Sequence, residues 1–565
     1  MPDQSSTGVP ERLARTADEV FGWSELRPGQ LTAMEAVVRG RDTLAVMPTG
    51  AGKSAVYQVP GLLLPGPTVV VSPLIALQRD QIAGLLSHAD APDAVAVNSA
   101  QAAGETEAAW DAVRHGDAEF LFLSPEQLAK DEVVERLARA APSLFVVDEA
   151  QCVAAWGHDF RPDYLRLAQA AQRVGRPTVL ALTATAAPPV REEIVERLGL
   201  EDPALVVAGF DRPNIALEVR RFLDDTDKRR VVVERAAAEP KPGIVYTATR
   251  RDAEAYAADL AELGLSAAAY HAGLTAGERS RAHDAFLAGE TDVVVATSAF
   301  GMGIDKEDVR FVLHASVPGS LDAYYQEIGR AGRDGGPAVA VLHYRSQDSG
   351  LQRMFATRAP DEDTLGAVAE RVHERDAPVE PDAIAKDTGL TRRRVTAAVN
   401  LLTQAGAVHT EDDGRVRAVA GTTTGEAAAR AAEEARSRRR LERSRLAMML
   451  GYAETTGCRR RFLLGYFGEP YDAPCGACDM CAAPESGGSV VDGVGGTGEE
   501  PPAPAAASYA AGARVRHAEW GEGTVMSEEG DRITVLFESM GYRTLSLAAI
   551  TGKGLLSAAP PPATS

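Results

Sequence analysis

The sequence lacks any apolar run that is free of Pro, Gly and charge and long enough to cross a bilayer, so it predicts no membrane-spanning helix. Residues 1–15 contain no basic segment followed by an apolar core, and we therefore expect no signal peptide. Cysteine is scarce, with five in 565 residues, and most lie close together near the end. This distribution argues against a disulfide framework and favours a bound metal.

A surplus of positive charge is also absent, because the formal net charge is −21 at pH 7. Whole-chain charge excludes little, since nucleic-acid binding depends on where the basic residues cluster. Hydrophobic residues make up 45% of the chain and charged residues 25%, which is typical of a soluble globular protein. The length predicts about three to five domains.

Short apolar runs rich in Val, Leu or Phe occur in two sets within residues 40–345. Continuous apolar runs separated by helix-length segments indicate parallel strands buried on both faces. The first set is Thr43–Met47, Thr68–Val71, Phe120–Leu123, Leu144–Val147 and Val179–Leu182. The second set is Ile244–Tyr246, Ala267–Tyr270, Val293–Ala296, Phe311–His314 and Val339–Leu342. We therefore predict two α/β lobes with a cleft between them, in which ligands sit at the carboxyl ends of the strands.

A phosphate-binding loop, MPTGAGKS (47–54), follows the first run. Its glycines allow the backbone N–H groups to approach and hold phosphates. Lys53 is expected to reach the β- and γ-phosphates and Ser54 to bind Mg²⁺. Met47 departs from the fuller pattern, which has glycine there. The alternative is a chance Gly-Lys-Ser turn, which the preceding strand and the following helical segment disfavour. The nucleotide-binding candidates of this loop are Thr49, Gly50, Gly52, Lys53 and Ser54.

The segment DEAQ (148–151) follows the fourth run, and adjacent carboxylates at the end of a buried strand have no obvious packing role. We expect Asp148 to hold the Mg²⁺ through water and Glu149 to orient and deprotonate the attacking water.

The segment YYQEIGRAGRDG (324–335) carries Arg330 and Arg333 between glycines. On a helix, positions three apart lie on one face, and two cations with little steric cover suit a polyphosphate better than a core. Taken alone, the pattern fits a solvated arginine pair equally well. The upstream phosphate loop and carboxylate pair favour a catalytic role, in which the second lobe supplies both arginines to stabilise transition-state charge.

From Phe21 to Arg345 the chain resembles the RecQ family of superfamily-two DNA helicases. The segments that carry the resemblance are FGWSELRPGQ (21–30), SPLIALQRDQ (72–81), SPEQL (124–128), QCVAAWGHDFRPDY (151–164), FDRPN (210–214), YHAGL (270–274) and ATSAFGMGIDKEDVRFVLH (296–314). The resemblance implies two tandem RecA-like lobes and 3′→5′ unwinding of DNA driven by ATP. It implies that Gln30, supported by Arg27, contacts the edge of the adenine base and that FDRPN is a hinge. It also implies a catalytic role for Gln326 and a nucleotide-binding role for Asp305.

Aromatic side chains interleaved with a cation follow DEAQ directly, and such faces stack nucleic-acid bases. The alternative is a core role for Trp156 and Phe160, which the intervening polar residues disfavour. The DNA-binding candidates in this loop are Trp156, His158, Phe160 and Arg161. Weaker candidates for contacts with the DNA backbone, of which half could be purely structural, are Ser72, Thr249, Arg250, His271 and Thr297.

Two departures from the RecQ pattern stand out. Gln151 occupies the position where the family usually has His; it can still hydrogen-bond to the Thr183–Thr185 segment but cannot titrate. The family's winged helix after the zinc module is absent, as is its C-terminal helical module, so the family's strand-separating hairpin cannot be carried over.

Residues 364–419 nevertheless predict a winged-helix-like module in the order helix, helix, turn, helix, hairpin. Gly389 ends one short helix, Thr391 caps the next, and the hairpin turns at Asp413-Gly414. Arg392, Arg393 and Arg394 start the longer helix, where such motifs commonly meet DNA. A protein-docking or spacer module with a solvated basic corner is almost as well supported.

Cys458 precedes RRRFLLGYFGE, and CGACDMC contains Cys475, Cys478 and Cys481. Overlapping C-x-x-C pairs plus one distant cysteine predict a closed, structural Cys₄ zinc site, against the alternative of free or redox-active thiols. The RecQ zinc module has the same layout. Cys152 is expected to be a small buried residue.

Residues 483–507 are Gly, Pro, Ala, Ser and acidic residues, which predicts a flexible linker. Residues 512–545 resemble the Tudor-like barrel at the end of UvrD-type helicases, which in that group contacts RNA polymerase. A stability cap or a general nucleic-acid barrel is the alternative.

We thus expect a cytoplasmic, nucleoid-associated bacterial ATP-dependent DNA helicase that acts on single-stranded and forked DNA in repair or recombination. The alternatives are a DNA-stimulated translocase that does not unwind and a transcription-associated adaptor recruited through its barrel. The predicted domains are lobe 1 (1–205), lobe 2 (206–345), the winged-helix-like insertion (346–420), a helical zinc module (421–482), the linker (483–507) and the barrel (508–556).

Overall fold

The structure is a computed structural model, and it separates into two compact units. The first contains residues Met1–Gly209, Gly301–Asp305 and Thr357–Arg439, and the second Phe210–Phe300, Lys306–Ala356 and Arg440–Ser565. The residues that the structure describes are 8–88, 90–99, 101–154, 162–301, 304, 306–348, 350, 361–375, 377–411, 414–419, 421, 423–472, 474–482, 509, 513–529, 532–537, 540–547, 549–550 and 555–558. None of the helices in these ranges is both long and apolar enough to span a membrane.

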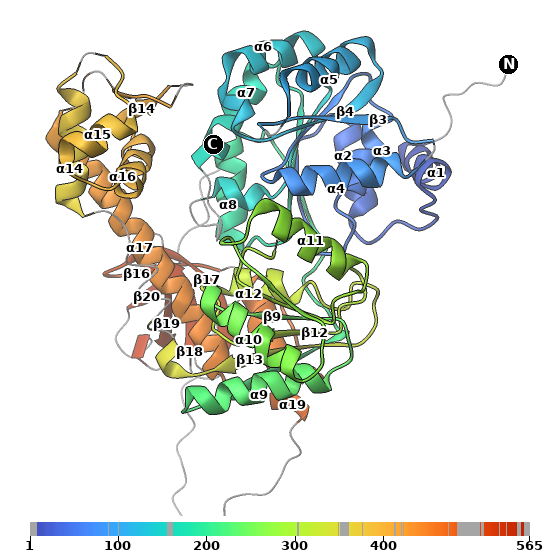
Figure 1. Cartoon of the computed structure of the whole chain (residues 1–565), viewed down its shortest axis with the longest axis vertical. Helices are drawn as coiled ribbons and strands as arrows, with labels where there is room; N and C mark the ends of the chain where they lie inside the picture. The colour runs from blue at the N-terminus through green and yellow to red at the C-terminus, as the bar shows by residue number, and fades with distance from the viewer. Residues whose placement is uncertain are drawn as a thin grey trace, which may run out of the picture. The chain divides into compact units, whose positions relative to one another are not determined.

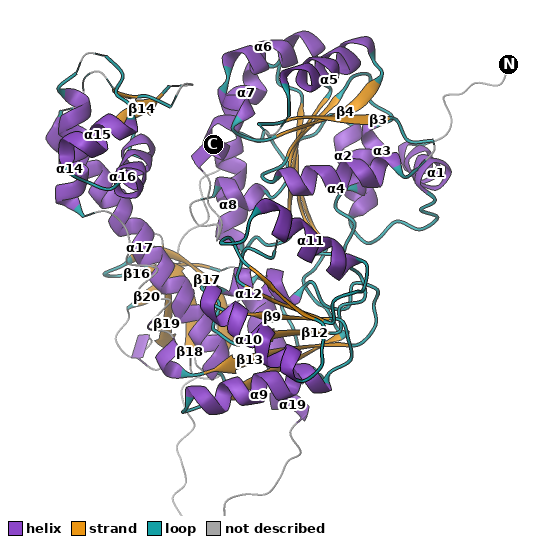
Figure 2. Ribbon diagram, in the orientation of Figure 1, coloured by secondary structure: helices purple, strands orange, loops and turns teal. Residues whose placement is uncertain are grey.

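The first unit is built on a seven-stranded sheet of order β3-β4-β2-β5-β6-β1-β7 in which every pair is parallel (Figures 1 and 2). Its strands are β1 Thr43–Val46, β2 Thr68–Val71, β3 Asp93–Val97, β4 Ala118–Leu123, β5 Leu144–Val147, β6 Thr178–Thr183 and β7 Ala204–Val207. Its α-helices are α1 Val9–Phe21, α2 Gln30–Val38, α3 Ala55–Gly61, α4 Ile75–Leu86, α5 Ala103–His115, α6 Asp131–Ala140, α7 Leu167–Arg173 and α8 Pro188–Leu198.

Every residue of the central strands β1, β2 and β5 is buried, which confirms the prediction of strands covered on both faces. One face packs against α1, α2 and α3 through a cluster that includes Phe21, Met34 and Tyr57. This arrangement places the carboxyl ends of β1, β5 and β6, which are neighbours in the sheet, at one edge of the lobe.

The second unit contains a six-stranded parallel sheet of order β10-β11-β9-β12-β13-β8. Its strands are β8 Ile215–Arg221, β9 Gly243–Tyr246, β10 Ala267–Tyr270, β11 Val293–Ala296, β12 Phe311–His314 and β13 Ala338–Tyr344. The helices of this lobe are α9 Asp225–Ala238, α10 Arg250–Glu262, α11 Ala276–Leu287 and α12 Leu321–Ile328. The two predicted α/β lobes are therefore both present.

Three strands were not predicted from the sequence: β3, β7 and β8. All three lie at an edge of their sheet. An edge strand is covered less completely than a central one, so its sequence can contain exposed and charged residues. The strand β8, IALEVRR, shows this, because only two of its seven residues are buried.

The helix, helix, helix and hairpin order predicted for the winged-helix-like module is present in the first unit. Its elements are α14 Glu362–His373, α15 Pro381–Thr388, α16 Arg392–Gln404, β14 Val408–Thr410 and β15 Val416–Ala418, with the two strands antiparallel. Thr391 caps α16 by accepting from the Arg394 N–H, and Gly389 ends α15 at φ +70°. Of the predicted turn residues, Asp413 lies outside the described residues.

The remaining elements of the second unit are the long helix α17 Thr424–Glu454, which begins in the first unit, and the helices α18 Arg459–Tyr466 and α19 Asp479–Ala482. A five-stranded antiparallel sheet of order β19-β18-β17-β16-β20 follows as an open half-barrel. Its strands are β16 Arg514–His517, β17 Gly521–Glu529, β18 Arg532–Phe537, β19 Gly541–Ser546 and β20 Leu556–Ala558. The predicted linker lies outside the described residues.

Candidate active site and metal centre

The phosphate-binding loop connects β1 to α3, and two of its glycines adopt conformations that other residues rarely do. Gly50 has φ +79° and Gly52 has φ +71°. A Cβ atom on Gly52 would lie 2.7 Å from Gln30 Nε2, so the position is closed to side chains by space as well as by conformation. The loop therefore presents bare backbone directly before the first turn of a helix, where N–H groups can bind phosphate.

Gln30, at the start of α2, holds this loop from one side. Its Nε2 donates to the carbonyl oxygens of Ala51 at 3.0 Å and Gly52 at 2.8 Å. Its Oε1 accepts from the backbone N–H of Arg27 at 2.7 Å, and the Arg27 side chain is exposed. The Gln30 amide therefore braces the phosphate-binding loop, in addition to the adenine contact that the sequence resemblance implies.

Asp148 lies at the end of β5 and is 5% exposed. Its Oδ2 accepts from Gln81 Nε2 at 3.1 Å and its Oδ1 from the Glu149 N–H at 2.9 Å. Burial and, second, the neighbouring Glu149 carboxylate raise the pKa of Asp148 to about 6, against the opposing effect of the Lys53 ammonium. The phosphate-binding loop and Asp148 follow parallel strands at the same edge of the sheet, and the Lys53 charge acts on this carboxylate.

A chain of hydrogen bonds runs from Glu149 to the end of β6. Gln151 Nε2 donates to Glu149 Oε2 at 2.7 Å, and Thr183 Oγ1 donates to Gln151 Oε1 at 2.6 Å. The backbone N–H of Thr185 then donates to Thr183 Oγ1 at 3.1 Å. Glu149 itself has φ +50°, an uncommon value for a residue with a side chain. The predicted bond from Gln151 to the Thr183–Thr185 segment is thus confirmed.

Two residues of this site were not predicted as functional from the sequence. Gln81, near the middle of α4, donates to Asp148, and the Tyr164 hydroxyl donates to the Asp148 carbonyl oxygen at 3.1 Å. Both stand inside segments that carry the sequence resemblance, at the last position of SPLIALQRDQ and of QCVAAWGHDFRPDY. Their position in these segments was the available signal.

Arg330 and Arg333 belong to the second unit, and the prediction that a helix displays them is wrong. Helix α12 ends at Ile328, and turns follow that include Gly332 at φ +56°. Arg330 is only 3% exposed, which contradicts the expected lack of steric cover, whereas Arg333 is half-buried. We call residues 329–336 the arginine loop. Gln326 is half-buried on α12, one turn before this loop.

Two residues of the FDRPN segment fix the arginine loop. Arg212 donates to the carbonyl oxygens of Gly329, Ala331 and Gly332 at 2.9 to 3.1 Å. Asn214 Nδ2 donates to those of Gly332 and Gly336 at 2.8 Å. A Cβ atom on Gly332 would lie 2.4 Å from Asn214 Nδ2, so the close approach requires glycine. The segment predicted as a hinge is therefore also the support for Arg330 and Arg333.

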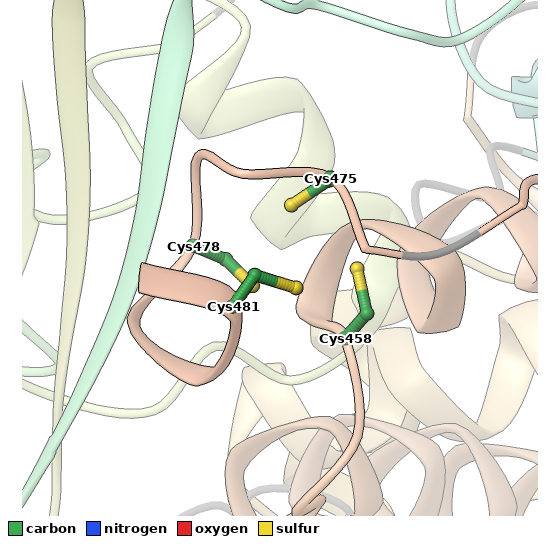
Figure 3. A group of neighbouring side chains, drawn as sticks. All are labelled: Cys458, Cys475, Cys478 and Cys481. Carbon is green, nitrogen blue, oxygen red and sulfur yellow. The ribbon is translucent and has the colours of Figure 1, made fainter. Parts of the chain in front are cut away.

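The four cysteines near the end of the chain come together in the second unit. Their Sγ atoms all lie within 4.8 Å of one another, and Figure 3 shows the side chains of Cys458, Cys475, Cys478 and Cys481 pointing toward one another. Zinc–sulfur bonds of about 2.3 Å in a tetrahedron place sulfur atoms roughly 3.8 Å apart, so this set fits Zn²⁺ with little adjustment. Cys152 is fully buried in the first unit, as predicted.

We call residues 475–481 the cysteine loop. This loop is hydrogen-bonded to the edge of the parallel sheet of the second unit. The Leu217 N–H of β8 donates to the Ala477 carbonyl oxygen at 3.0 Å, and the Val219 N–H donates to Asp479 Oδ2 at 3.2 Å. Arg459, 2% exposed, bonds both carboxylate oxygens of Asp479 at 2.8 and 3.0 Å. A metal held here would therefore link α18, the cysteine loop and β8.

The residues predicted to contact DNA are less completely placed. Trp156, His158, Phe160 and Arg161, together with the nucleotide-binding candidate Asp305, lie outside the described residues. Ser72 is fully buried, and His271 is 3% exposed and lies 3.0 Å from Glu254 Oε1. Thr297 is half-buried, Arg392 pairs with Asp382, and Arg393 is exposed. Burial of Ser72 and His271 makes them unsuited to a surface contact in this structure.

Known protein families match four segments of the chain. They are the DEAD/DEAH box helicase family at residues 27–194, the helicase conserved C-terminal domain at 227–335, the RecQ zinc-binding family at 417–482 and a protein of unknown function (DUF3553) at 510–552.

Two curated relatives are similar along most of this chain. The probable ATP-dependent DNA helicase RecS of Bacillus subtilis (strain 168) is 35% identical over 476 residues, which cover 83% of this chain and 91% of that protein. The ATP-dependent DNA helicase RecQ of Pasteurella multocida (strain Pm70) is 33% identical over 466 residues. That match covers 82% of this chain but only 61% of the relative, so the chain spans less than two thirds of its length.

Solved structures show the same fold at low identity. The DUF1998 helicase MrfA bound to DNA matches with a TM-score of 0.51 and 18% identity, over 75% of this chain and 61% of that one. The DEAD-box helicase Mss116 bound to single-stranded RNA matches with a TM-score of 0.51 and 17% identity, over 71% and 89%. One of these is bound to DNA and the other to RNA, so the likeness extends to the fold and not to the choice of nucleic acid.

Proposed function

The chain belongs to the RecQ family of ATP-dependent DNA helicases, and from this premise we propose that it moves 3′→5′ along single-stranded DNA and unwinds duplex ahead of it. We place this activity in DNA repair or recombination, in the bacterial cytoplasm at the nucleoid. The observation that carries the proposal is that Lys53, after β1, and the Asp148–Glu149 pair, after β5, lie at the same edge of the parallel sheet on either side of β6, where the Lys53 charge acts on Asp148.

The residues around the phosphate-binding loop suit Mg²⁺-ATP. Ser54 and the Asp148 carboxylate offer the oxygen atoms that Mg²⁺ prefers, so these two would hold the ion, directly or through water. The chemistry supplied there would be neutralisation of negative charge on the phosphates. Lys53 would bind the same phosphates, and Gln30 would exchange one of its loop contacts for the adenine edge.

Hydrolysis then depends on Glu149 and on the arginine loop. Glu149 would accept a proton from the attacking water, and its bond to Gln151 would hold the carboxylate in position. Arg330 and Arg333 would enter the site from the second unit and stabilise charge on the transferred phosphoryl group. Such arginines contribute about three to five orders of magnitude in rate. Because they belong to a separate unit, hydrolysis would be coupled to the motion of one unit against the other.

DNA would be held along both units. The sequence segment that contains Trp156 and Phe160 comes shortly after Asp148–Gln151, which would link base stacking to hydrolysis. The exposed Arg393, at the start of α16, is the strongest candidate in the winged-helix-like module. We retain residues 346–420 as that module and 421–482 as the zinc module in this proposal.

Strand displacement on forked DNA with a 3′ or a 5′ single-stranded tail tests the proposal, with Lys53→Ala as the inactive control. We expect displacement of the 3′-tailed substrate only, and we expect loss of activity in Lys53→Ala and Glu149→Gln. ATP hydrolysis stimulated by DNA without displacement would identify a translocase instead. Hydrolysis indifferent to DNA would overturn the proposal.

A second function is a contact with RNA polymerase through residues 508–556, which the sequence resemblance to UvrD-type barrels suggests. The family matched at 510–552 has no assigned function, so it neither supports nor opposes this contact. Full-length protein should retain RNA polymerase from a bacterial lysate, and a full-length variant with Arg516→Glu and Arg532→Glu, two exposed residues of the half-barrel, should retain less. Absence of retention by the wild type would end this part of the proposal.

A further inference from the structure

The half-barrel is seated on the zinc module within the second unit. Gly541, the first residue of β19, approaches α17 so closely that a Cβ atom on it would lie 2.4 Å from Ser444 Oγ and 2.7 Å from Ser444 Cβ. Ser444 is 1% exposed. Gly541 and Ser444 are therefore in direct contact.

Tyr542 is buried by the contact between the half-barrel and the zinc module, and not by the core of the half-barrel. Along β19, Leu545 packs against the half-barrel core, so by the two-residue alternation of a strand Tyr542 points to the opposite face. Tyr542 is nevertheless only 5% exposed. Its ring lies against that of Tyr466 on α18, with centroids 5.4 Å apart. A large side chain on the outer face of the half-barrel is thus covered by the zinc module.

Tyr466 connects this contact to the helix that precedes the arginine loop. Its hydroxyl donates to Asp322 Oδ2 on α12, and Asp322 is 3% exposed. Burial raises the pKa of Tyr542, as does the nearby Asp322 carboxylate, while hydrogen bonding with Tyr466 and the charge of Arg445 lower it. The side chains of Asp322 on α12, Arg445 on α17, Tyr466 on α18 and Tyr542 on β19 form one buried polar network, which we call the tyrosine network.

Helix α12 also contacts α17, through a residue that lies on a different face from Asp322. The Tyr324 and Tyr452 hydroxyl oxygens lie 3.2 Å apart, and both residues are fully buried. Helix α12 therefore contacts the zinc module at two points, through Asp322 and through Tyr324. The half-barrel covers the first of these contacts with Tyr542. A buried carboxylate that loses part of its surroundings admits water and loosens the element that carries it.

We propose that Tyr542 makes the half-barrel a positioning element for α12 and the arginine loop, so that ATP hydrolysis is fast only while the half-barrel is seated on the zinc module. The proposal rests on the proposed role of Arg330 and Arg333 in hydrolysis. We place neither Tyr542 nor Ser444 among the nucleotide-binding residues. Tyr542 would act through Tyr466 and Asp322, and Ser444 would act by keeping β19 in contact with α17.

The test uses the full-length protein with Tyr542→Ala, Tyr542→Phe and Ser444→Phe. Tyr542→Ala removes the ring that the half-barrel packs against Tyr466. Ser444→Phe forces Gly541 away from α17 without changing the sequence of the half-barrel. Tyr509→Phe is the matched control, because it removes a tyrosine hydroxyl from the half-barrel outside the network. Zinc content and the thermal unfolding midpoint show that each variant is folded.

We expect kcat for DNA-stimulated ATP hydrolysis to fall about tenfold in Tyr542→Ala and Ser444→Phe with KM for ATP unchanged, since small displacements of positioned groups reduce rate more than binding. Tyr542→Phe, which keeps the ring, should recover most of the rate. Amide hydrogen exchange in residues 321–335 should be faster in the two disruptive variants and unchanged in Tyr509→Phe. Wild-type kcat together with unchanged exchange in both disruptive variants would overturn the inference.

Exchange in residues 321–335 also separates this inference from the proposed function. If the wild type did not hydrolyse ATP with DNA, the proposed function would fail while the exchange comparison would still show whether the half-barrel orders α12.

Discussion

The side-chain amide of Gln30 donates to the Gly52 carbonyl oxygen at 2.8 Å, in the middle of the phosphate-binding loop. Together with the bond to the Ala51 carbonyl oxygen it braces the loop, and the Arg27 N–H holds the amide in place. Gln30→Ala should raise KM for ATP about tenfold, because ordering the loop would then reduce the free energy of ATP binding by roughly 1.4 kcal/mol. Steady-state ATP hydrolysis measures this change.

Gln78→Ala is the matched control for Gln30, because Gln78 is another buried glutamine of the same lobe and its Nε2 bonds the Ser72 carbonyl oxygen. It should lower thermal stability and leave KM for ATP unchanged. An equal KM in Gln30→Ala and the wild type would show that the loop is ordered without the amide.

The carboxyl of Asp148 should make the stability of the nucleotide-free protein depend on pH in an unusual direction. Its pKa is raised from 3.8 to about 6, so the folded protein binds a proton between these values that the unfolded chain does not. Above about pH 6 the buried charge opposes folding, and this penalty disappears as the pH falls toward 4. In EDTA, Asp148→Asn should therefore melt at a higher temperature than the wild type at pH 8.

The difference between Asp148→Asn and the wild type should shrink as the pH is lowered through 6. Thermal unfolding followed by circular dichroism from pH 5 to pH 8 measures it. A difference that does not vary with pH would contradict the raised pKa.

Gln151 and Thr183 should behave as one unit in hydrolysis. Gln151→Leu and Thr183→Val each break the hydrogen-bond chain that orients Glu149, and each should lower kcat about tenfold, which is part of the roughly 10²–10⁴-fold that a positioned general base contributes. The double variant should be little worse than either single one, because the second change removes nothing further. Full additivity of the two effects in a double-mutant cycle would argue against the chain.

The cysteine cluster should hold about one zinc ion per chain, measured by metal analysis after denaturation. Cys478→Ser should lose the ion, and because α18, the cysteine loop and β8 meet there, thermal stability should fall. Cys152→Ser, a change to a buried cysteine of the other unit, should keep the zinc. A fully active protein without metal would refute a structural zinc site.

Charge reversal of Arg392, Arg393 and Arg394 should weaken binding to forked DNA and flatten its dependence on salt, since each phosphate contact releases counterions. Arg375→Glu, an exposed change in the same module, is the control. Unchanged affinity and salt slope, measured by fluorescence anisotropy, would leave the module a spacer or protein-docking element.

The central strands of both sheets could be predicted from sequence because burial on both faces leaves continuous apolar runs. Edge strands such as β8 could not, because exposure lets charged residues enter and the run disappears. The geometry of Arg330 and Arg333 was also beyond the sequence. Their spacing fits a helix, but Gly332 and the bonds from Arg212 and Asn214 impose a turn instead. These bonds join residues more than one hundred positions apart, which no local pattern reveals.

The pairing of the cysteine loop with β8 has a consequence for solubility. An edge strand with unpaired N–H and C=O groups is a template for the strands of other chains. In this protein the Leu217 and Val219 N–H groups are occupied by the loop that the four cysteines shape. Removing the zinc would therefore uncover a sheet edge, and metal-depleted protein should accumulate as aggregate before it accumulates as inactive monomer.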